Sequence, residues 1–478
     1  MSESLIDKNQ LRRFYAIIAS FLALSCFFIA KEMYYFAALP LVLGVLFLAI
    51  FSLDTIIYII AFATPFAITL NDKSSGPALS IPSEPLMFGV LLLFMFKFLF
   101  EGGFDKKILR HPVSISIFFM LGWMLITTLT SSFPLVSLKH LVSQMWFIIP
   151  FYFLGTQIFK EKKNIKKFIW LYLFSLIVIV IYTLIRHGQN DWSQKAAHWV
   201  MIPFYNDHTA YAAVLALFIP PALYLWRDKT SNLRQRTFTS MAFWLLMVGT
   251  IMSYTRAAWL SLVLVGIIYL IYLFKIKFTN VLLLSAVGLV FFFSVKDQVL
   301  MKLEKNRQDS ATDFNKHIQS ISNISTDASN LERINRWNCA FRMWKQKPLM
   351  GWGPGTYQFN YAPFQKSNEM TIISTNAGNM GNAHSEFIGP LAEQGILGMV
   401  FMIILVTVVI YSGTMIYSKS KNKQTKNFAL AILLGLITYF IHGTLNNFLD
   451  TDKLAVPVWG FIAAIVALDV YHSNEKVE

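Results

Sequence analysis

About fourteen apolar runs, each long enough to cross a bilayer, follow one another along this chain of 478 residues. In the membrane every backbone N–H and C=O must be paired, so only helices or closed barrels can span it. The runs are continuously apolar and lack the alternation of barrel strands. They lie at roughly 14–30, 34–51, 53–70, 85–100, 113–130, 141–159, 168–185, 209–226, 238–254, 257–274, 279–295, 395–417, 428–445 and 455–471.

These runs predict an all-α fold, a polytopic helical membrane protein with about 14 (12–14) transmembrane helices. Composition agrees, because 55% of the residues are hydrophobic and 14% are charged, which excludes an ordinary soluble protein. The net charge is +15. A nucleic-acid-binding protein would gather its Lys and Arg residues on one domain. Here most of them lie in short connections between apolar runs, which indicates membrane topology and no nucleic-acid partner.

The basic residues also predict which connections face the cytoplasm, because cytoplasmic loops are enriched in Lys and Arg. With the N-terminus inside, the strongly basic connections are all cytoplasmic: 97–110, 160–167, 227–236, 275–277 and 419–426. Both termini are then cytoplasmic. This divides the chain into an N-terminal transmembrane bundle (1–185), core helices with short outer loops (186–295), one large outer loop (296–394) and C-terminal helices (395–478).

The second half of the large outer loop has a helical pattern. Ser329-Asn330-Leu331-Glu332 is a capping box that predicts a helix start. Pro348 and the glycines of 351–355 predict its end. Spacings of three and four residues place the apolar side chains on one face. We expect an amphipathic helix lying on the membrane surface, with an aromatic face toward the lipid, made of Leu331, Ile334, Trp337, Phe341 and Trp344.

Polar side chains at the outer edge of the membrane are candidates for a site, because such groups are costly there and usually functional. One outer loop begins with Arg186-His187 and ends with Asn206-Asp207-His208. A short outer turn carries Arg256, and the amphipathic helix carries basic residues as well. A final histidine precedes a short apolar stretch that ends at Gly395. The basic residues of the helix and this histidine are Arg333, Arg336 and His384.

Four motifs between about 170 and 450 together resemble the O-antigen ligase and polymerase family. They are Asn206-Asp207-His208-Thr209-Ala210-Tyr211, Tyr254-Thr255-Arg256-Ala257-Ala258-Trp259-Leu260, Pro348-Leu349-Met350-Gly351-Trp352-Gly353-Pro354-Gly355 and Asn382-Ala383-His384-Ser385 followed by Leu391-Ala392-Glu393-Gln394-Gly395-Ile396-Leu397-Gly398. Order, spacing and common outer placement carry the resemblance, since no single motif is specific.

The resemblance implies a GT-C-like glycosyltransferase in the bacterial inner membrane, with a periplasmic active site. Such an enzyme transfers a glycan from an undecaprenyl-pyrophosphate carrier to an acceptor hydroxyl. Ligases use lipid A core as acceptor, polymerases use another repeat unit, and some relatives modify protein Ser or Thr. We expect a ligase-like function. A polymerase is the alternative, and a flippase or transporter for lipid-linked sugars is the alternative from another class.

Two residues are predicted to be catalytic. A guanidinium at the membrane edge can bind pyrophosphate through two hydrogen bonds, and the family resemblance gives this role to Arg256. The alternative is an arginine that reaches the lipid headgroups. A sugar hydroxyl needs a proton acceptor, and the resemblance gives this role to His384. A short helix beginning near Ser385 would keep the imidazole neutral through its dipole. The alternative is a histidine with a structural role.

Further residues are predicted to bind substrate. Arg186 and Arg333 are candidates for a second phosphate-binding arginine, and Glu386 for orienting His384 or favouring a helix start. The remaining candidates are Asn206, His208 and Trp352.

We expect no cofactor and no metal. Asp450-Thr451-Asp452 has the spacing of cation ligands but is expected to be an exposed loop. Two arginines can stabilise a pyrophosphate leaving group without a metal, as the family resemblance implies. The expected reaction is metal-independent and inverting.

Overall fold

The computed structural model describes residues 53–70, 79–101, 103–277, 279–280, 328–371, 374–375 and 381–473, with a few residues between 20 and 31. The chain divides into two units, Met1–Ile59 and Ile60–Glu478. The described residues are mostly helical and include one small two-stranded sheet.

Nine helices in the described part are long and apolar enough to span a membrane. Each coincides with a predicted run, so the all-α, polytopic membrane fold is confirmed. They are α5 (Ser83–Glu101), α7 (Pro112–Leu129), α8 (Pro134–Ile148) continued by η2 (Ile149–Leu154) and α9 (Gly155–Ile158), α10 (Lys162–Gly188), α12 (His208–Arg227), α14 (Arg256–Leu273), α19 (Ile388–Lys419), α20 (Lys423–His442), and α21 (Asp452–Ala467) continued by η4 (Leu468–His472).

The remaining predicted runs differ in outcome. The run 238–254 forms most of α13 (Leu233–Met252), a helix that begins with polar residues and is not among the nine apolar ones. The runs 14–30, 34–51 and 279–295 lie almost entirely outside the described residues. The count of about fourteen spans therefore stays a prediction.

The predicted span 53–70 is wrong in its last third. Helix α4 (Leu53–Ala63) passes into a short turn of 3-10 helix, η1 (Thr64–Phe66). Strand β1 (Ile68–Leu70) then pairs antiparallel with β2 (Leu79–Ile81). The buried ammonium of Lys453 donates hydrogen bonds of 2.5 Å to the Thr64 carbonyl and 2.6 Å to the Ala67 carbonyl. These carbonyls are therefore paired without a further helical turn.

Small residues bring α12 and α14 together. Ala212 and Ala216 of α12 and Ala258 of α14 form a buried cluster, with Leu262 packed against it. Small side chains allow helix backbones to approach closely in a membrane protein. Both helices begin on the same side of the helix bundle, so this contact places the N-terminus of α14 beside that of α12. There Thr255 Oγ1 donates to the His208 carbonyl over 3.4 Å.

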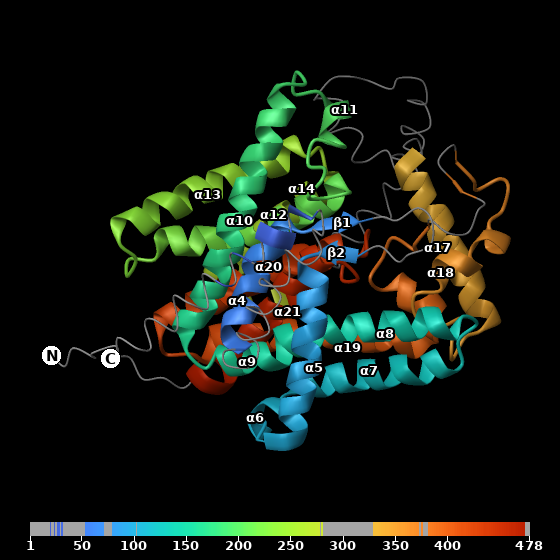
Figure 1. Cartoon of the computed structure of the whole chain (residues 1–478), viewed down its shortest axis with the longest axis horizontal. Coiled ribbons are helices and arrows are strands. Elements are labelled where there is room, and N and C mark those ends of the chain that lie inside the picture. The colour runs from blue at the N-terminus through green and yellow to red at the C-terminus, as the bar shows by residue number, and fades with distance from the viewer. Residues whose placement is uncertain are drawn as a thin grey trace. The chain divides into compact units, whose positions relative to one another are not determined.

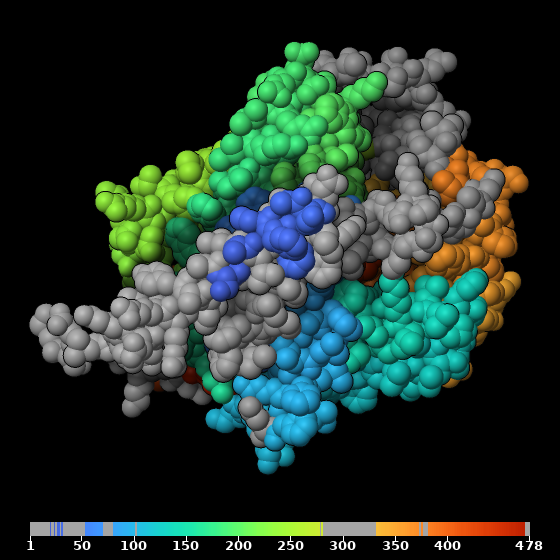
Figure 2. Space-filling view, viewed as in Figure 1, coloured from blue at the N-terminus to red at the C-terminus, as the bar shows by residue number. Residues whose placement is uncertain are grey.

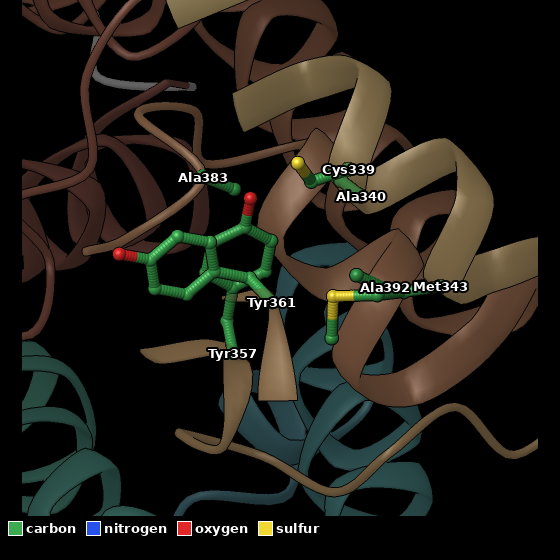
Figure 3. Close-up of a cluster of buried hydrophobic side chains, with 7 residues drawn as sticks. All are labelled: Cys339, Ala340, Met343, Tyr357, Tyr361, Ala383 and Ala392. Carbon is green, nitrogen blue, oxygen red and sulfur yellow. The ribbon is translucent and has the colours of Figure 1, made fainter. Parts of the chain in front are cut away.

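The described part of the large loop packs as a small helical body. It consists of α17 (Ala328–Gln346), α18 (Tyr357–Asn360) and η3 (Ala362–Phe364). Its core contains Cys339, Ala340, Met343, Tyr357 and Tyr361, together with Ala383 and Ala392 (Figure 3). The rings of Tyr357 and Tyr361 stack in parallel, with centroids 5.4 Å apart. In Figure 2 this body lies against the segment that contains α7 and α8, to which it is hydrogen-bonded through Ser132 and Ser137.

Helix α17 begins at Ala328 and ends at Gln346, close to the predicted bounds. However, the predicted capping role of Glu332 is wrong, because its carboxylate bonds to Arg336 and Thr371 instead. The face of α17 that is buried in the protein is not the aromatic face. It carries Glu332, Asn335, Arg336, Cys339, Ala340 and Met343, whereas Phe341 is 41% exposed. The aromatic face is thus left on the outside of the body, and contact with lipid stays a prediction.

A clamp joins the glycine turn 348–355 to the start of α19. The N–H of Trp352 donates to the Ala392 carbonyl over 3.2 Å, and the N–H of Ile396 donates to the Pro348 carbonyl over 3.0 Å. Gly395 has a φ of +70°, which separates a short helix from the long membrane-spanning part of α19. This agrees with the predicted short stretch ending at Gly395. In Figure 1 the long part of α19 runs beside α7.

Candidate functional site

Arg256 is the first residue of α14 and is half-buried. The turn before it is fixed internally: the Thr255 N–H donates to Ser253 Oγ over 3.3 Å, and the Ser253 hydroxyl donates to the Thr250 carbonyl over 2.7 Å. Tyr254 has a φ of +51°, which is uncommon for a residue with a side chain. A cation at a helix N-terminus opposes the helix dipole, whereas a bound anion would be favoured by both.

Arg333, one of the two candidates for a second phosphate-binding arginine, lies near Arg256. The charges of the two guanidinium groups are near enough to interact, and so are those of Arg333 and Asp207. Arg333 Nε donates to the Leu445 carbonyl over 3.2 Å, which links α17 to the loop after α20. Burial lowers the pKa of Arg333, while Asp207 acts in the opposite direction. Arg256 of α14 and Arg333 of α17 thus lie near each other.

Asp207 caps α12 and supplies a negative charge to this place. Its carboxylate accepts hydrogen bonds from the Thr209 N–H over 2.8 Å and from the Thr209 hydroxyl over 2.6 Å. His208 Nδ1 lies 3.4 Å from Asp207 Oδ1. Burial alone would raise the pKa of Asp207, but these hydrogen bonds outweigh burial and leave it at about 2. Asp207 is therefore an anion at neutral pH, and it was only part of a motif in the sequence, without a predicted role.

His384 lies in the same charged environment, in the loop before α19. Its backbone has a φ of +47°, and its N–H donates to Asn382 Oδ1 over 3.0 Å. Burial, followed by the nearby Arg333 and Arg336 guanidinium groups, lowers the pKa of His384 to about 4. The imidazole is therefore neutral at pH 7, as predicted, although burial and two arginines are the main causes. Within the described residues the ring makes no hydrogen bond, and the bond of His384 is that of its backbone N–H.

Arg336 belongs to the site although no role was predicted for it. Its Nε donates to Glu332 Oε1 over 2.6 Å, and its guanidinium lies 4.0 Å from the centroid of the Tyr361 ring. Both charged side chains are buried. Gly381 gives Arg336 its room, because a Cβ at position 381 would stand 1.6 Å from Arg336 Nη1. The Arg336 guanidinium thus lies against Gly381, in the loop that leads to His384.

Glu386 accepts hydrogen bonds from the loop after α20, and within the described residues it makes no hydrogen bond to His384. Its Oε1 accepts hydrogen bonds from the Tyr439 hydroxyl and from the N–H groups of Phe448 and Leu449, over 2.7 and 2.9 Å. Burial raises the pKa of Glu386 to about 7. Of the two roles weighed for this residue, the contacts favour neither directly. Glu386 positions the loop after α20.

Arg186 is held by its own loop. Its Nη1 donates to the Tyr182 hydroxyl over 2.8 Å, to the Val200 carbonyl over 3.1 Å and to the Ile202 carbonyl. The guanidinium also lies over the Trp199 ring, 5.2 Å from its centroid. These contacts turn Arg186 toward residues 182–202, and none of its contacts in the described part of the chain is with Arg256.

The other predicted substrate-binding residues occupy different settings. His208 is beside Asp207, and its ring lies 4.2 Å from that of His198. Asn206 is exposed next to it. The indole N–H of Trp352 donates to the Met343 carbonyl over 3.0 Å, and Lys347 lies 4.2 Å from its ring centroid. Trp352 therefore helps to hold the glycine turn against α17.

The aspartates of 450–452 point to different places. Asp452 accepts a hydrogen bond from the Ser83 hydroxyl, whereas Asp450 lines a cavity described below. Within the described ranges no group of three or more His, Cys, Asp or Glu side chains is arranged to hold a metal ion.

His442 is a further residue that the sequence did not single out. It lies at the end of α20, and its Nε2 is 3.1 Å from Asn446 Nδ2. The His442 imidazole lies close enough to Arg333 and Asp207 for their charges to interact with it. The only signal for it in the sequence is a polar residue at the end of an apolar run, a signal shared with many structural histidines.

Arg256, Arg333, Asp207 and His384 thus come together from α14, α17, the start of α12 and the loop before α19. A neutral imidazole beside two arginines can accept a proton next to a bound anion. No curated protein matches the chain. The model of the O-antigen ligase family matches residues 241–403, a segment that contains Arg256, Arg333 and His384. It supports an activity of the O-antigen ligase or polymerase type in general. The match of residues 241–403 of this membrane protein to the O-antigen ligase family agrees with the family resemblance of its motifs.

Proposed function

We propose that this protein is a glycosyltransferase acting at the periplasmic face of the bacterial inner membrane, which transfers a glycan from undecaprenyl pyrophosphate to an acceptor hydroxyl in the manner of an O-antigen ligase. The observation that supports it best is that Arg333 lies near both Arg256 and a neutral His384. Lipid A core is the proposed acceptor. The polyprenyl tail of the donor would lie among the helices, within the bilayer.

In the proposed reaction His384 removes the proton from the acceptor hydroxyl. The acceptor oxygen then attacks the anomeric carbon of the donor, and the bond from that carbon to the pyrophosphate oxygen breaks. Direct displacement inverts the configuration at the anomeric carbon. Undecaprenyl pyrophosphate leaves, and the two guanidinium groups stabilise its increasing negative charge by hydrogen bonds that need no proton transfer. No metal is required in this scheme.

Asp207 and Arg336 have supporting parts in the proposal. Asp207 balances the charge of Arg333 before the donor arrives, so the arginine need not be left as an isolated buried cation. Arg336 holds the 381–384 loop and, as a cation, keeps His384 neutral. A base that is neutral at the working pH can accept a proton, whereas an imidazolium cannot.

The test is glycan transfer in membranes containing His384→Ala, Arg256→Ala, Arg333→Ala or Arg186→Ala protein. We expect the first two changes to reduce the rate by about 10²–10⁴-fold, because each removes a group that acts on the reacting atoms. Arg333→Ala should behave like Arg256→Ala, and Arg186→Ala should mainly lower the thermal stability. Full transfer by well-folded His384→Ala or Arg256→Ala protein would contradict the assignment.

The acceptor is decided by a second experiment. Deletion of the gene should remove all polymer from lipid A core if the protein is a ligase. A single repeat unit remaining on the core would instead identify a polymerase. Transfer by purified protein in detergent, without any sealed compartment, would distinguish either enzyme from a flippase.

A further inference from the structure

A cavity of about 110 Å³ lies next to the loop that carries His384. Residues on both sides of the histidine, Asn382 and Ser385 among them, form part of its wall. The remaining wall comes from α7, α8, α18, α19, α21 and the loop 447–450. No Lys or Arg of the described residues lines it, so the cavity differs in character from the arginine-rich region beside it. The histidine loop stands between a cationic and an acidic region.

The cavity wall contains both hydrogen-bond acceptors and a donor. The carboxyl groups of Glu386, Glu393 and Asp450 line it. Trp459 also lines it and is 1% exposed, yet its indole N–H has no hydrogen-bond partner among the described residues. Asn447 Oδ1 is likewise buried and unpaired within the described part. An indole N–H can only donate, whereas carboxylate and amide oxygens accept.

This mixture of groups indicates the class of ligand. Inorganic cations would satisfy the oxygens and leave the indole N–H unpaired, and the described residues contain no metal-binding cluster. Phosphate groups would meet three carboxyl groups with no lysine or arginine among the described residues of the wall. A sugar hydroxyl both donates and accepts, so hydroxyl groups can satisfy the whole set. Buried polar groups without partners are costly, which gives such a ligand a reason to bind.

We propose that this cavity binds hydroxyl groups of the acceptor sugar, a phosphate-free sugar residue, and presents one hydroxyl to His384. The assignment rests on the proposed function. The cavity has room for several water molecules, and therefore for part of one sugar ring. It is smaller than pockets that enclose a whole ligand, so the rest of the acceptor lies outside it.

Direct sugar binding tests the cavity without depending on transfer. The probes are the methyl glycosides of glucose, galactose, mannose and N-acetylglucosamine, added to purified protein in lipid nanodiscs and followed by saturation-transfer NMR. Trp459→Phe removes the N–H together with the five-membered ring that carries it, and Asp450→Asn removes one negative charge. Trp146→Phe is the matched control, because the Trp146 N–H is also buried and unpaired in the described part but does not line the cavity.

We expect at least one glycoside to bind the wild-type protein, and the Kd to rise about fivefold or more in Trp459→Phe and Asp450→Asn, as for loss of one hydrogen bond. Trp146→Phe should bind like the wild type, and inorganic pyrophosphate should not displace the sugar. Three results would overturn the assignment: no binding of any glycoside, equal binding by the cavity variants and wild type, or displacement by pyrophosphate. An equal loss in Trp146→Phe would overturn it too.

Kinetics separate this assignment from the proposed function. With lipid A core extracted from a strain lacking the gene as acceptor, Trp459→Phe should raise the acceptor KM and leave the donor KM unchanged. If wild-type protein transfers no glycan, the proposed function fails while sugar binding is still measurable. If transfer occurs but the donor KM changes instead, the proposed function stands and the cavity assignment fails.

Discussion

His384 and Tyr254 both have left-handed backbone conformations, with φ of +47° and +51°. Such a conformation costs about 1–3 kcal/mol for a residue with a side chain and persists only where neighbouring contacts enforce it. His384 is the proposed base, and Tyr254 lies two residues before Arg256. Both functional turns are therefore held rigidly, which keeps the arginine and the histidine in place before substrate arrives.

The pKa of His384 predicts the pH dependence of transfer. It is lowered to about 4 by burial and by Arg333 and Arg336, against the opposing effect of Asp207 and Glu332. The imidazole is therefore neutral above this value, and kcat/KM should fall only toward pH 4 rather than near 6.5. Arg333→Gln removes a cation, so the pKa of His384 should rise and the acid limb should move to higher pH.

The measurement is a kcat/KM profile for transfer between pH 4 and pH 8, with wild-type and Arg333→Gln membranes. Relative to the wild type, the variant should lose more activity at pH 5 than at pH 7.5. An acid limb that is the same in both proteins would show that the arginine does not act on the base.

Single residues were predictable where chemistry coincides with the end of an apolar run. Arg256, Arg333 and His384 could be chosen as candidate site residues because a charged or titratable group at the membrane edge is unusual. Arg336 could not be distinguished, because its role depends on the absence of a side chain at Gly381, nearly fifty positions away in the chain. For Arg186 the sequence shows the charge but not the loop carbonyls at 200 and 202 that bind it.

At the scale of elements, the kink in α19 depends on Gly395. Its φ is +70°, and a Cβ there would stand 1.9 Å from the Leu349 carbonyl oxygen. We expect Gly395→Ala to separate the glycine turn from α19, lower the Tm and reduce transfer, with a loss of more than about 2 kcal/mol in stability. Gly266→Ala in α14 is the control, because a Cβ there meets nothing within 4 Å.

The check is the Tm of both variants in detergent together with their transfer rates. Gly266→Ala should be neutral or slightly stabilising, since alanine favours a helix over glycine. Equal Tm values for Gly395→Ala and wild type would show that the kink is not constrained by the clamp.

At the scale of the whole chain, hydropathy predicted the nine long apolar helices of the described residues. It could do so because one local property, apolar length, decides whether a segment spans a membrane. The hairpin of β1 and β2 was missed because its start depends on Lys453, which is 389 positions from Thr64. The polar inward face of α17 was missed for a similar reason. Its contacts with Tyr361 and Thr371 come from the fold of the loop, and the apolar pattern of the helix indicates the other face.

Topology gives a prediction for the whole molecule. Lys345, exposed at the end of α17, should lie outside, and Lys421, exposed between α19 and α20, should lie inside. In spheroplasts a membrane-impermeant maleimide should label Lys345→Cys protein at once and Lys421→Cys protein only after permeabilisation. The wild-type chain, which has Cys26 and Cys339, measures the background. Labelling of Lys421→Cys in intact spheroplasts would contradict the predicted orientation.

The clamp between 348–355 and 391–396 has a consequence for exchanging parts between related proteins. Gly351 and Gly395 need each other's segment, because a Cβ at Gly351 would meet the backbone of Glu393 and one at Gly395 would meet that of Leu349. A chimaera joined at 394/395, the boundary that the sequence predicts, would take the two halves of this contact from different parents. A transplanted loop should therefore extend through Ile396, so that both halves of this contact come from the same parent.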